Sequence, residues 1–203
     1  QGRFRLARRF GEPEWFRFPP PVGEVRVVLA AQDEVATLPY FIPMSDLDVK
    51  AGGNDIERLR RWHRQGKLWP SDGQSDQRFP ATVGPAEVAG LLRRRALRDA
   101  CFAVAVSVIG RVGRAWFERQ RACVFPSLRQ LRRRRFLATP IAFAAAESAA
   151  SFITHWPKRM AGVLPPEGLP KETRRSIVAD LRRKGFQFHR NARRIPAEPA
   201  SAR

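Results

Sequence analysis

Residues that commonly bind metals or attack substrates are scarce in this sequence. Its 203 residues include two cysteines and three histidines. Cys101 and Cys123 form no CxxC pair, and His63, His155 and His189 lie far apart, so no zinc-binding spacing is present. Two cysteines also exclude the disulfide framework of a small secreted scaffold. We expect two reduced thiols in a reducing compartment, with a single disulfide as the alternative, and no bound metal.

The sequence also lacks the motifs of common catalytic and nucleotide-binding sites. It contains no GxSxG, no GxxxxGK[ST] and no GxGxxG segment. Asp46, Asp48 and Glu57 match three positions of a calcium-binding loop, but Lys50 and Ala51 stand where a ligand and a glycine are needed. We therefore predict a protein that is not an enzyme and that has no cofactor.

Acidic residues are outnumbered two to one by basic residues. The chain has 19 aspartates and glutamates against 38 lysines and arginines, and its net charge is +19. Five of the 38 are lysines, so 33 are arginines. This surplus indicates a polyanionic partner or an anionic lipid surface, because the planar guanidinium binds phosphate well. Codon usage in a GC-rich genome is the alternative explanation for the excess of arginine over lysine.

The first 84 residues show no long regular pattern. Residues 1–10 hold four arginines and no acid, which is typical of an organelle transit peptide or of a basic extension of the mature chain. Arginines and aromatic residues alternate over residues 1–23, which predicts an extended arm lying on a partner. Residues 24–84 are expected to be irregular, with at most an edge strand at the start and one short helix. That helix is expected to begin at Asn54, because Asn54 followed by Glu57 is typical of a capping box.

Helical spacing of apolar residues dominates residues 85–185. From Pro85 these residues recur at steps of three and four, which predicts a helix to about Ala122. A second helical stretch over residues 127–157 would form a hairpin with the first, and a further helix is expected over Lys171–Lys184. Residues 186–203 are interpreted as a basic tail. The predicted fold class is mainly α, with a small helical core between extended basic N- and C-terminal arms.

One hydrophobic run is long enough to cross a membrane. Residues 136–156 contain a single charged residue, Glu147, and 21 helical residues span about 31 Å. Pro140 and Glu147 oppose insertion, so a helix buried in protein is an equal alternative to a transmembrane helix. In either setting Glu147 needs a positive partner. Arg111 or Arg114, on the preceding predicted helix, is expected to form a structural ion pair with it.

Clusters of arginine are the remaining feature with a clear chemical meaning. Any one cluster is often a solvated surface, but several in one chain indicate contacts with phosphate. That phosphate belongs either to RNA or to an anionic phospholipid of the cardiolipin type. The residues predicted to make these contacts are Arg93, Arg94, Arg95, Arg132, Arg133, Arg134, Arg135, Arg193 and Arg194.

Two functions follow from these observations. The first is a non-catalytic accessory subunit of a mitochondrial inner-membrane complex, either a respiratory-chain complex or ATP synthase, with its basic segments on the matrix side. Its partners would be other protein subunits in a hetero-oligomer, together with anionic phospholipid. The alternative is a mitochondrial ribosomal protein that binds rRNA through its arginine-rich arms. The first is favoured slightly, because it accounts for the run at residues 136–156.

Overall fold

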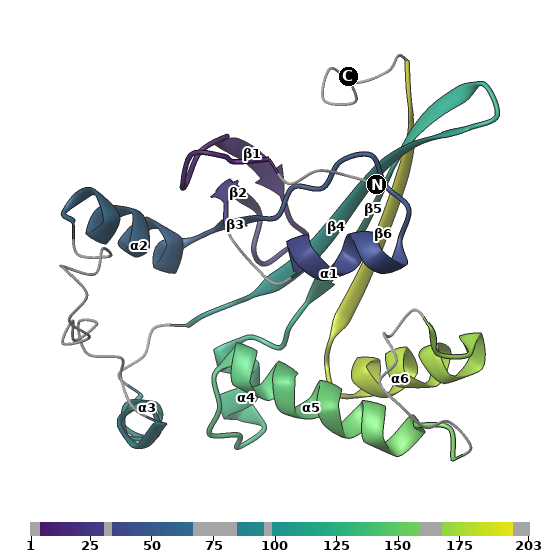
Figure 1. Ribbon diagram of the computed structural model, residues 1–203. Helices are drawn as coiled ribbons and strands as arrows, with labels where there is room; N and C mark the ends of the chain where they lie inside the picture. The colour runs from purple at the N-terminus through teal and green to yellow at the C-terminus, as the bar shows by residue number, and fades with distance from the viewer. Residues whose placement is uncertain (1–4, 31–33, 67–84, 96–98, 159–167, 197–203) are drawn as a thin grey trace. The chain divides into compact units, whose positions relative to one another are not determined.

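The fold is mixed α/β, as the computed structural model in Figure 1 shows. The structure describes residues 5–30, 34–66, 85–95, 99–158 and 168–196. In the described part of the chain, helices accompany two three-stranded antiparallel sheets, so the prediction of a mainly α protein is wrong. The chain divides into two compact units. The first comprises Gln1–Phe18, Gly23–Thr82 and Ile195–Arg203, and the second comprises Pro19–Val22 and Val83–Arg194.

The first unit is built on a small antiparallel sheet. Its strands are β1 (Glu14–Arg17), β2 (Glu24–Leu29) and β3 (Lys50–Gly52), with β2 in the centre. Helices α1 (Glu34–Phe41) and α2 (Asn54–Arg64) belong to the same unit. Val27 and Val28 of β2 are buried. The sequence predicts irregular or edge structure for residues 24–30, because it shows no clear second strand to pair with them. The partner strands β1 and β3 are only four and three residues long, which is too short to show the alternation of apolar and polar residues that indicates a strand.

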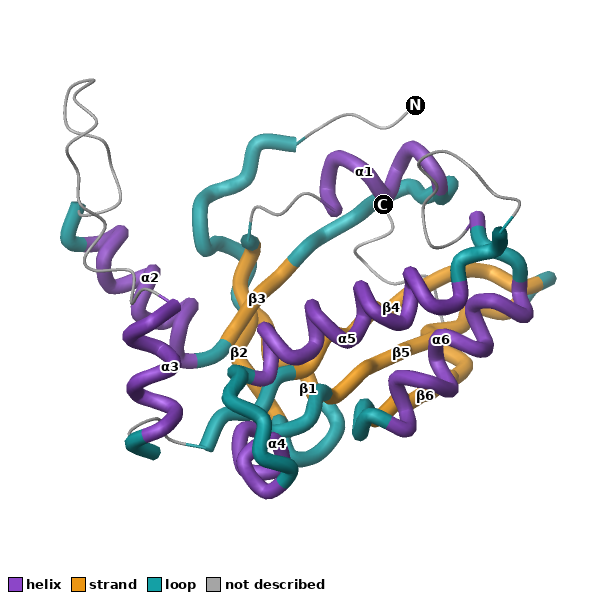
Figure 2. Tube along the Cα trace, turned by 90° about the horizontal axis from the view of Figure 1, so that it is seen from below, coloured by secondary structure: helices purple, strands orange, loops and turns teal. Residues whose placement is uncertain are grey.

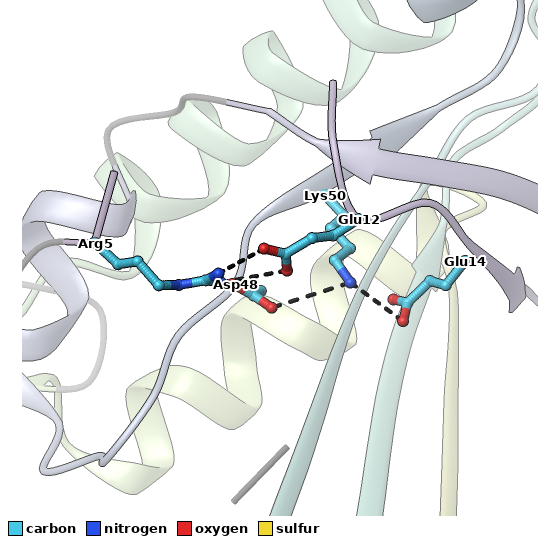
Figure 3. A network of polar contacts seen from close by, with 5 residues as sticks. All are labelled: Arg5, Glu12, Glu14, Asp48 and Lys50. Carbon is cyan, nitrogen blue, oxygen red and sulfur yellow. Dashed lines mark hydrogen bonds and ion pairs between the residues drawn. The ribbon is translucent and has the colours of Figure 1, made fainter. Parts of the chain in front are cut away.

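An exposed set of ion pairs connects the N-terminal segment to this sheet (Figure 3). The Arg5 guanidinium lies 2.6 Å from a Glu12 oxygen and 3.4 Å from an Asp48 oxygen. The Lys50 ammonium lies 3.2 Å from Glu14 and 4.0 Å from Asp48. Exposed pairs of this kind contribute little to stability. They nevertheless show that part of the predicted N-terminal arm folds back onto its own unit.

The helix predicted from Asn54 is confirmed, but its capping differs from the prediction. Gly53 is the residue before the helix, and no side chain caps the helix there. A capping box occurs elsewhere, at the start of α4 (Leu128–Arg133), where Ser127 and Gln130 bond to each other's backbone N–H groups. The sequence spacing therefore located the helix without identifying its cap.

The second unit combines a long antiparallel sheet with helices. Its sheet has the order β4 (Ala103–Val112), β5 (Ala115–Val124), β6 (Gln187–Ile195). Its helices are α3 (Pro85–Arg93), α4, α5 (Pro140–His155) and α6 (Lys171–Arg183). Figures 1 and 2 both show α5 and α6 side by side, near one end of the strands. The opposite end of the hairpin β4–β5 extends beyond these helices (Figure 1).

Residues 103–124 form a β-hairpin rather than the predicted helix. Val104, Val106 and Val108 alternate at a spacing of two, and β-branched residues favour strands. Gly113 closes the turn with a φ of 61°, a value that suits glycine. The predicted basic tail is also corrected, because residues 187–195 form β6, while residues 197–203 lie outside the described part of the chain.

The core of the second unit lies where the helices meet the sheet. It consists of buried apolar side chains from α4, α5, α6 and the segments that flank α6. These residues are Leu131, Phe143, Ala144, Leu169, Ile177, Leu181 and Phe186. Cys123 of β5 and Phe188 of β6 pack against this cluster. The predicted helix at Lys171–Lys184 is confirmed, and its residues Ile177 and Leu181 are the ones it buries.

The predicted transmembrane helix is not supported. In the described parts of the chain, no helix has both the length and the apolar character that crossing a membrane requires. Thr139 caps α5 and Pro140 occupies its first turn, so this helix has 16 residues and spans about 24 Å, against the about 30 Å of a bilayer core. Phe143 and Ala144 bury one side of α5 in the protein core.

Candidate nucleic-acid interface

One face of the sheet β4–β5–β6 combines apolar and basic side chains. In the antiparallel register of β4 and β5, Val104 lies opposite Cys123, Val106 opposite Arg121 and Val108 opposite Arg119. Directly opposed residues point to the same side of a sheet. The valines of β4 and the two arginines of β5 therefore share one face.

Strand β6 adds two further arginines to this face. Phe188 packs against the same cluster as Cys123, which places Phe188 on the face of the valines. Arg193 instead pairs with Glu118, which belongs to the opposite face. Because side chains alternate along a strand, both observations place Arg190 and Arg194 on the valine face. We call this surface the basic face and define it by seven residues: Val104, Val106, Val108, Arg119, Arg121, Arg190 and Arg194.

The basic face is open to solvent. Val104, Val106 and Val108 are 49%, 56% and 58% exposed, and the four arginines are exposed as well. Within the described strands, no aspartate or glutamate side chain lies on this face. The arginines therefore have no acidic neighbour on their own face to neutralise them, and they surround an apolar stripe.

The opposite face of the same sheet is electrically different. Arg193 lies 2.6 Å from a carboxylate oxygen of Glu118, whose other oxygen accepts a hydrogen bond from Ser107 at 3.0 Å. Glu118 thus balances Arg193. Among the described strands, one face of the sheet therefore pairs an arginine with a glutamate, and the other carries arginines and no carboxylate.

The predicted phosphate contacts are distributed over several places. Arg194 lies on the basic face, whereas Arg193 is paired on the other side. Arg134 donates a hydrogen bond to the carbonyl of Lys184 and lies over the rings of Phe136 and Phe143, at 5.3 and 5.9 Å from their centres. Its guanidinium is therefore part of the local packing. The remaining residues of the prediction lie at the C-terminal ends of two helices: Arg93, Arg94 and Arg95 at α3, and Arg132, Arg133 and Arg135 at α4.

The residues predicted to contact phosphate do not include Arg119, Arg121 or Arg190 of the basic face. The detectable signal was the alternation in the two strands: valine every second residue in 104–108, and arginine at 119 and 121. The helical interpretation of residues 85–122 hid this pattern. Arg190 is separated from β5 by more than sixty residues, so only the folded sheet places it on the strand next to β5.

Glu147 has a partner that the sequence analysis did not predict. The Lys184 ammonium lies 2.8 Å from Glu147 and 2.9 Å from Asp180, and it donates a hydrogen bond to the Ser151 hydroxyl at 3.2 Å. Ser151 is fully buried and donates its own proton to Asp180. Arg111 and Arg114, the partners that we expected, lie at the exposed turn of the hairpin β4–β5. The interacting pair therefore connects α5 to the end of α6.

This cluster is organised for stability rather than for nucleophilic attack. Hydrogen bonds to Glu147 and then to Asp180 raise the pKa of Lys184. Hydrogen bonds from Ser151 and then Lys184 lower the pKa of Asp180 to about 2. The Ser151 hydroxyl donates to Asp180, whose pKa of about 2 makes it a weak base, and protonated Lys184 cannot accept a proton, so neither neighbour activates this hydroxyl. Nor do the residues with described positions include three or more His, Cys, Asp or Glu side chains grouped to hold a metal ion.

No protein-family model matches the sequence, and no curated protein shows significant similarity to it. The chemistry of the surface must therefore carry any functional conclusion.

Proposed function

We propose that this chain is a non-catalytic RNA-binding component of a larger assembly, and that single-stranded RNA lies on the basic face. The observation that carries the proposal is the coincidence of four exposed arginines and an exposed valine stripe on one side of a sheet, with no carboxylate on that side among the described strands. The net charge of +19 agrees with a polyanionic partner.

The two kinds of side chain suit the two parts of a single-stranded nucleic acid. Arginine side chains bind phosphate through paired hydrogen bonds, and their planar groups also stack on bases. Val104, Val106 and Val108 offer apolar surface against which unstacked bases lose contact with water. In a duplex the bases are paired and stacked inside the helix, so a duplex would contact the arginines but not the valines. The surface therefore favours a single strand.

The correction to residues 136–156 also shifts the balance between the two predicted functions. The membrane-complex hypothesis depends on the interpretation of this run as a bilayer span. In the structure Phe143 and Ala144, from the middle of the run, belong to the protein core. The net charge of +19 then still needs an explanation, and binding to the phosphates of RNA explains it directly.

The test is a direct comparison of ligands with the 203-residue chain. A fluorescein-labelled RNA about 12 nucleotides long lies within the site size of known single-strand binders, and its anisotropy reports binding. We expect the RNA to bind more tightly than duplex DNA of equal charge. Equal or tighter binding of the duplex would contradict the proposal. So would co-sedimentation with vesicles rich in anionic lipid under salt conditions at which RNA does not bind.

A further inference from the structure

Strand β4 lies at one edge of its sheet. The order of the described strands is β4–β5–β6, so β4 has a hydrogen-bonded neighbour on one side only. Proteins usually protect such edges with charged residues, proline or a bulge. Residues 103–109 of β4 contain none of these, since they read AVAVSVI and pair with β5 without interruption. Among the described strands, the outer N–H and C=O groups of β4 are therefore available to pair with another strand.

The pairing with β5 determines which backbone groups are free. The carbonyl of Phe102 accepts a hydrogen bond from the N–H of Phe125 at 2.9 Å, so these two residues are a hydrogen-bonded pair. In an antiparallel ladder such pairs alternate with pairs that are not bonded. Every second residue from Phe102 onward therefore bonds to β5. Ala103, Ala105, Ser107 and Ile109 direct their N–H and C=O groups toward the open edge.

We propose that a second copy of this chain adds its own β4 antiparallel to this edge, in a register centred on Val106. The free groups of residues 103–109 then pair with those of the second copy, for a total of about eight main-chain hydrogen bonds. On the basic face, Val106 lies opposite Val106 of the second copy, and Val104 lies opposite the second copy's Val108. The two sheets become one sheet of six strands.

The charges and the side-chain pattern of the sheet favour pairing between the β4 edges of two copies over other contacts between copies. Stacking two basic faces on each other is disfavoured, because it would bring four arginines of each copy together. The open edge of β6 carries arginine at 190, 193 and 194, so pairing of β6 with itself is disfavoured too. The β4 edge is uncharged from 103 to 109, and a two-fold axis at Val106 aligns six valines into one stripe.

The proposal goes beyond RNA binding and is tested without RNA. Light scattering after gel filtration should give the wild-type chain twice its monomer mass of 23.1 kDa. Val106→Lys and Val106→Glu each place like charges opposite each other at the axis, so each alone should be a monomer. An equimolar mixture of the two should return to the double mass, because the opposed charges then attract.

Val112→Lys is the matched control, since Val112 is 57% exposed on the same strand but lies outside the paired segment. It should remain a dimer. Ala105→Pro is a second variant that removes an N–H from the open edge and not from the ladder to β5, and it should be a monomer with an unchanged circular dichroism spectrum. A wild-type monomer, a mixture that stays monomeric, or a monomeric Val112→Lys would each overturn the proposal. Loss of RNA binding with an intact dimer would refute only the proposed function.

Discussion

The salt dependence of RNA binding measures how many arginines of the basic face contact phosphate. For single strands the logarithm of the binding constant falls with the logarithm of the salt concentration, with a slope of about −0.7 per phosphate contact. If Arg119, Arg121, Arg190 and Arg194 each contact one phosphate, the slope is about −2.8. The affinity then falls about 50-fold between roughly 50 and 200 mM salt.

Replacing Arg119 and Arg121 by glutamine should halve this slope. The double variant retains two contacts, so its slope should be about −1.4 and its affinity should fall about 7-fold over the same range of salt. Fluorescence anisotropy titrations at four or more salt concentrations measure both slopes. The strand pairing should survive, because both side chains are exposed on the sheet.

The control removes the same charge from another place. Arg174 and Arg175 lie exposed in the first half of α6, and replacing both by glutamine lowers the net charge by the same two units. This variant should keep the wild-type slope. If the two double variants lowered the slope equally, binding would depend on net charge alone, and the assignment of the basic face would be wrong.

Further predictions concern stability and reactivity. Leu131→Ala should lower the free energy of unfolding by about 2–5 kcal/mol, because Leu131 is fully buried. Leu137→Ala, at an exposed site, should change that free energy by less than about 0.5 kcal/mol. Urea denaturation of both variants measures these changes. The folded-state pKa of Asp180 lies below its ordinary value of 3.8, so the stabilisation from its ionised carboxylate is present above pH 3.8 and is lost as the pH falls toward 2. Between these pH values the midpoint of urea denaturation should fall more steeply in the wild type than in Asp180→Asn. If the two midpoints changed in parallel with pH, the result would count against the ion cluster. Burial raises the pKa of Cys123 to about 11, so at pH 8 a thiol reagent should label the exposed Cys101 first, as peptide mass spectrometry would show; faster labelling of Cys123 would contradict its packing.

Local patterns predicted the helices whose boundaries are set by neighbouring residues. The helix from Asn54 and the helix over Lys171–Lys184 were both located from their starts, their stops and their apolar spacing. The hairpin at residues 103–124 was misread as a helix because Val104 and Val108 also lie four residues apart, which is a helical spacing. Deciding between the two periods required knowledge of β5 and β6, the partners that make a strand stable.

By itself, the sequence determined the surplus of arginine, the absence of known catalytic motifs and the positions of single helices, since each depends on composition or on residues close along the chain. The tertiary structure decided which arginines share a surface and that Lys184, rather than Arg111 or Arg114, pairs with Glu147. Those outcomes depend on strand register and helix packing between distant segments. A shift of one residue in the register of β6 would exchange Arg193 and Arg194 between the two faces of the sheet.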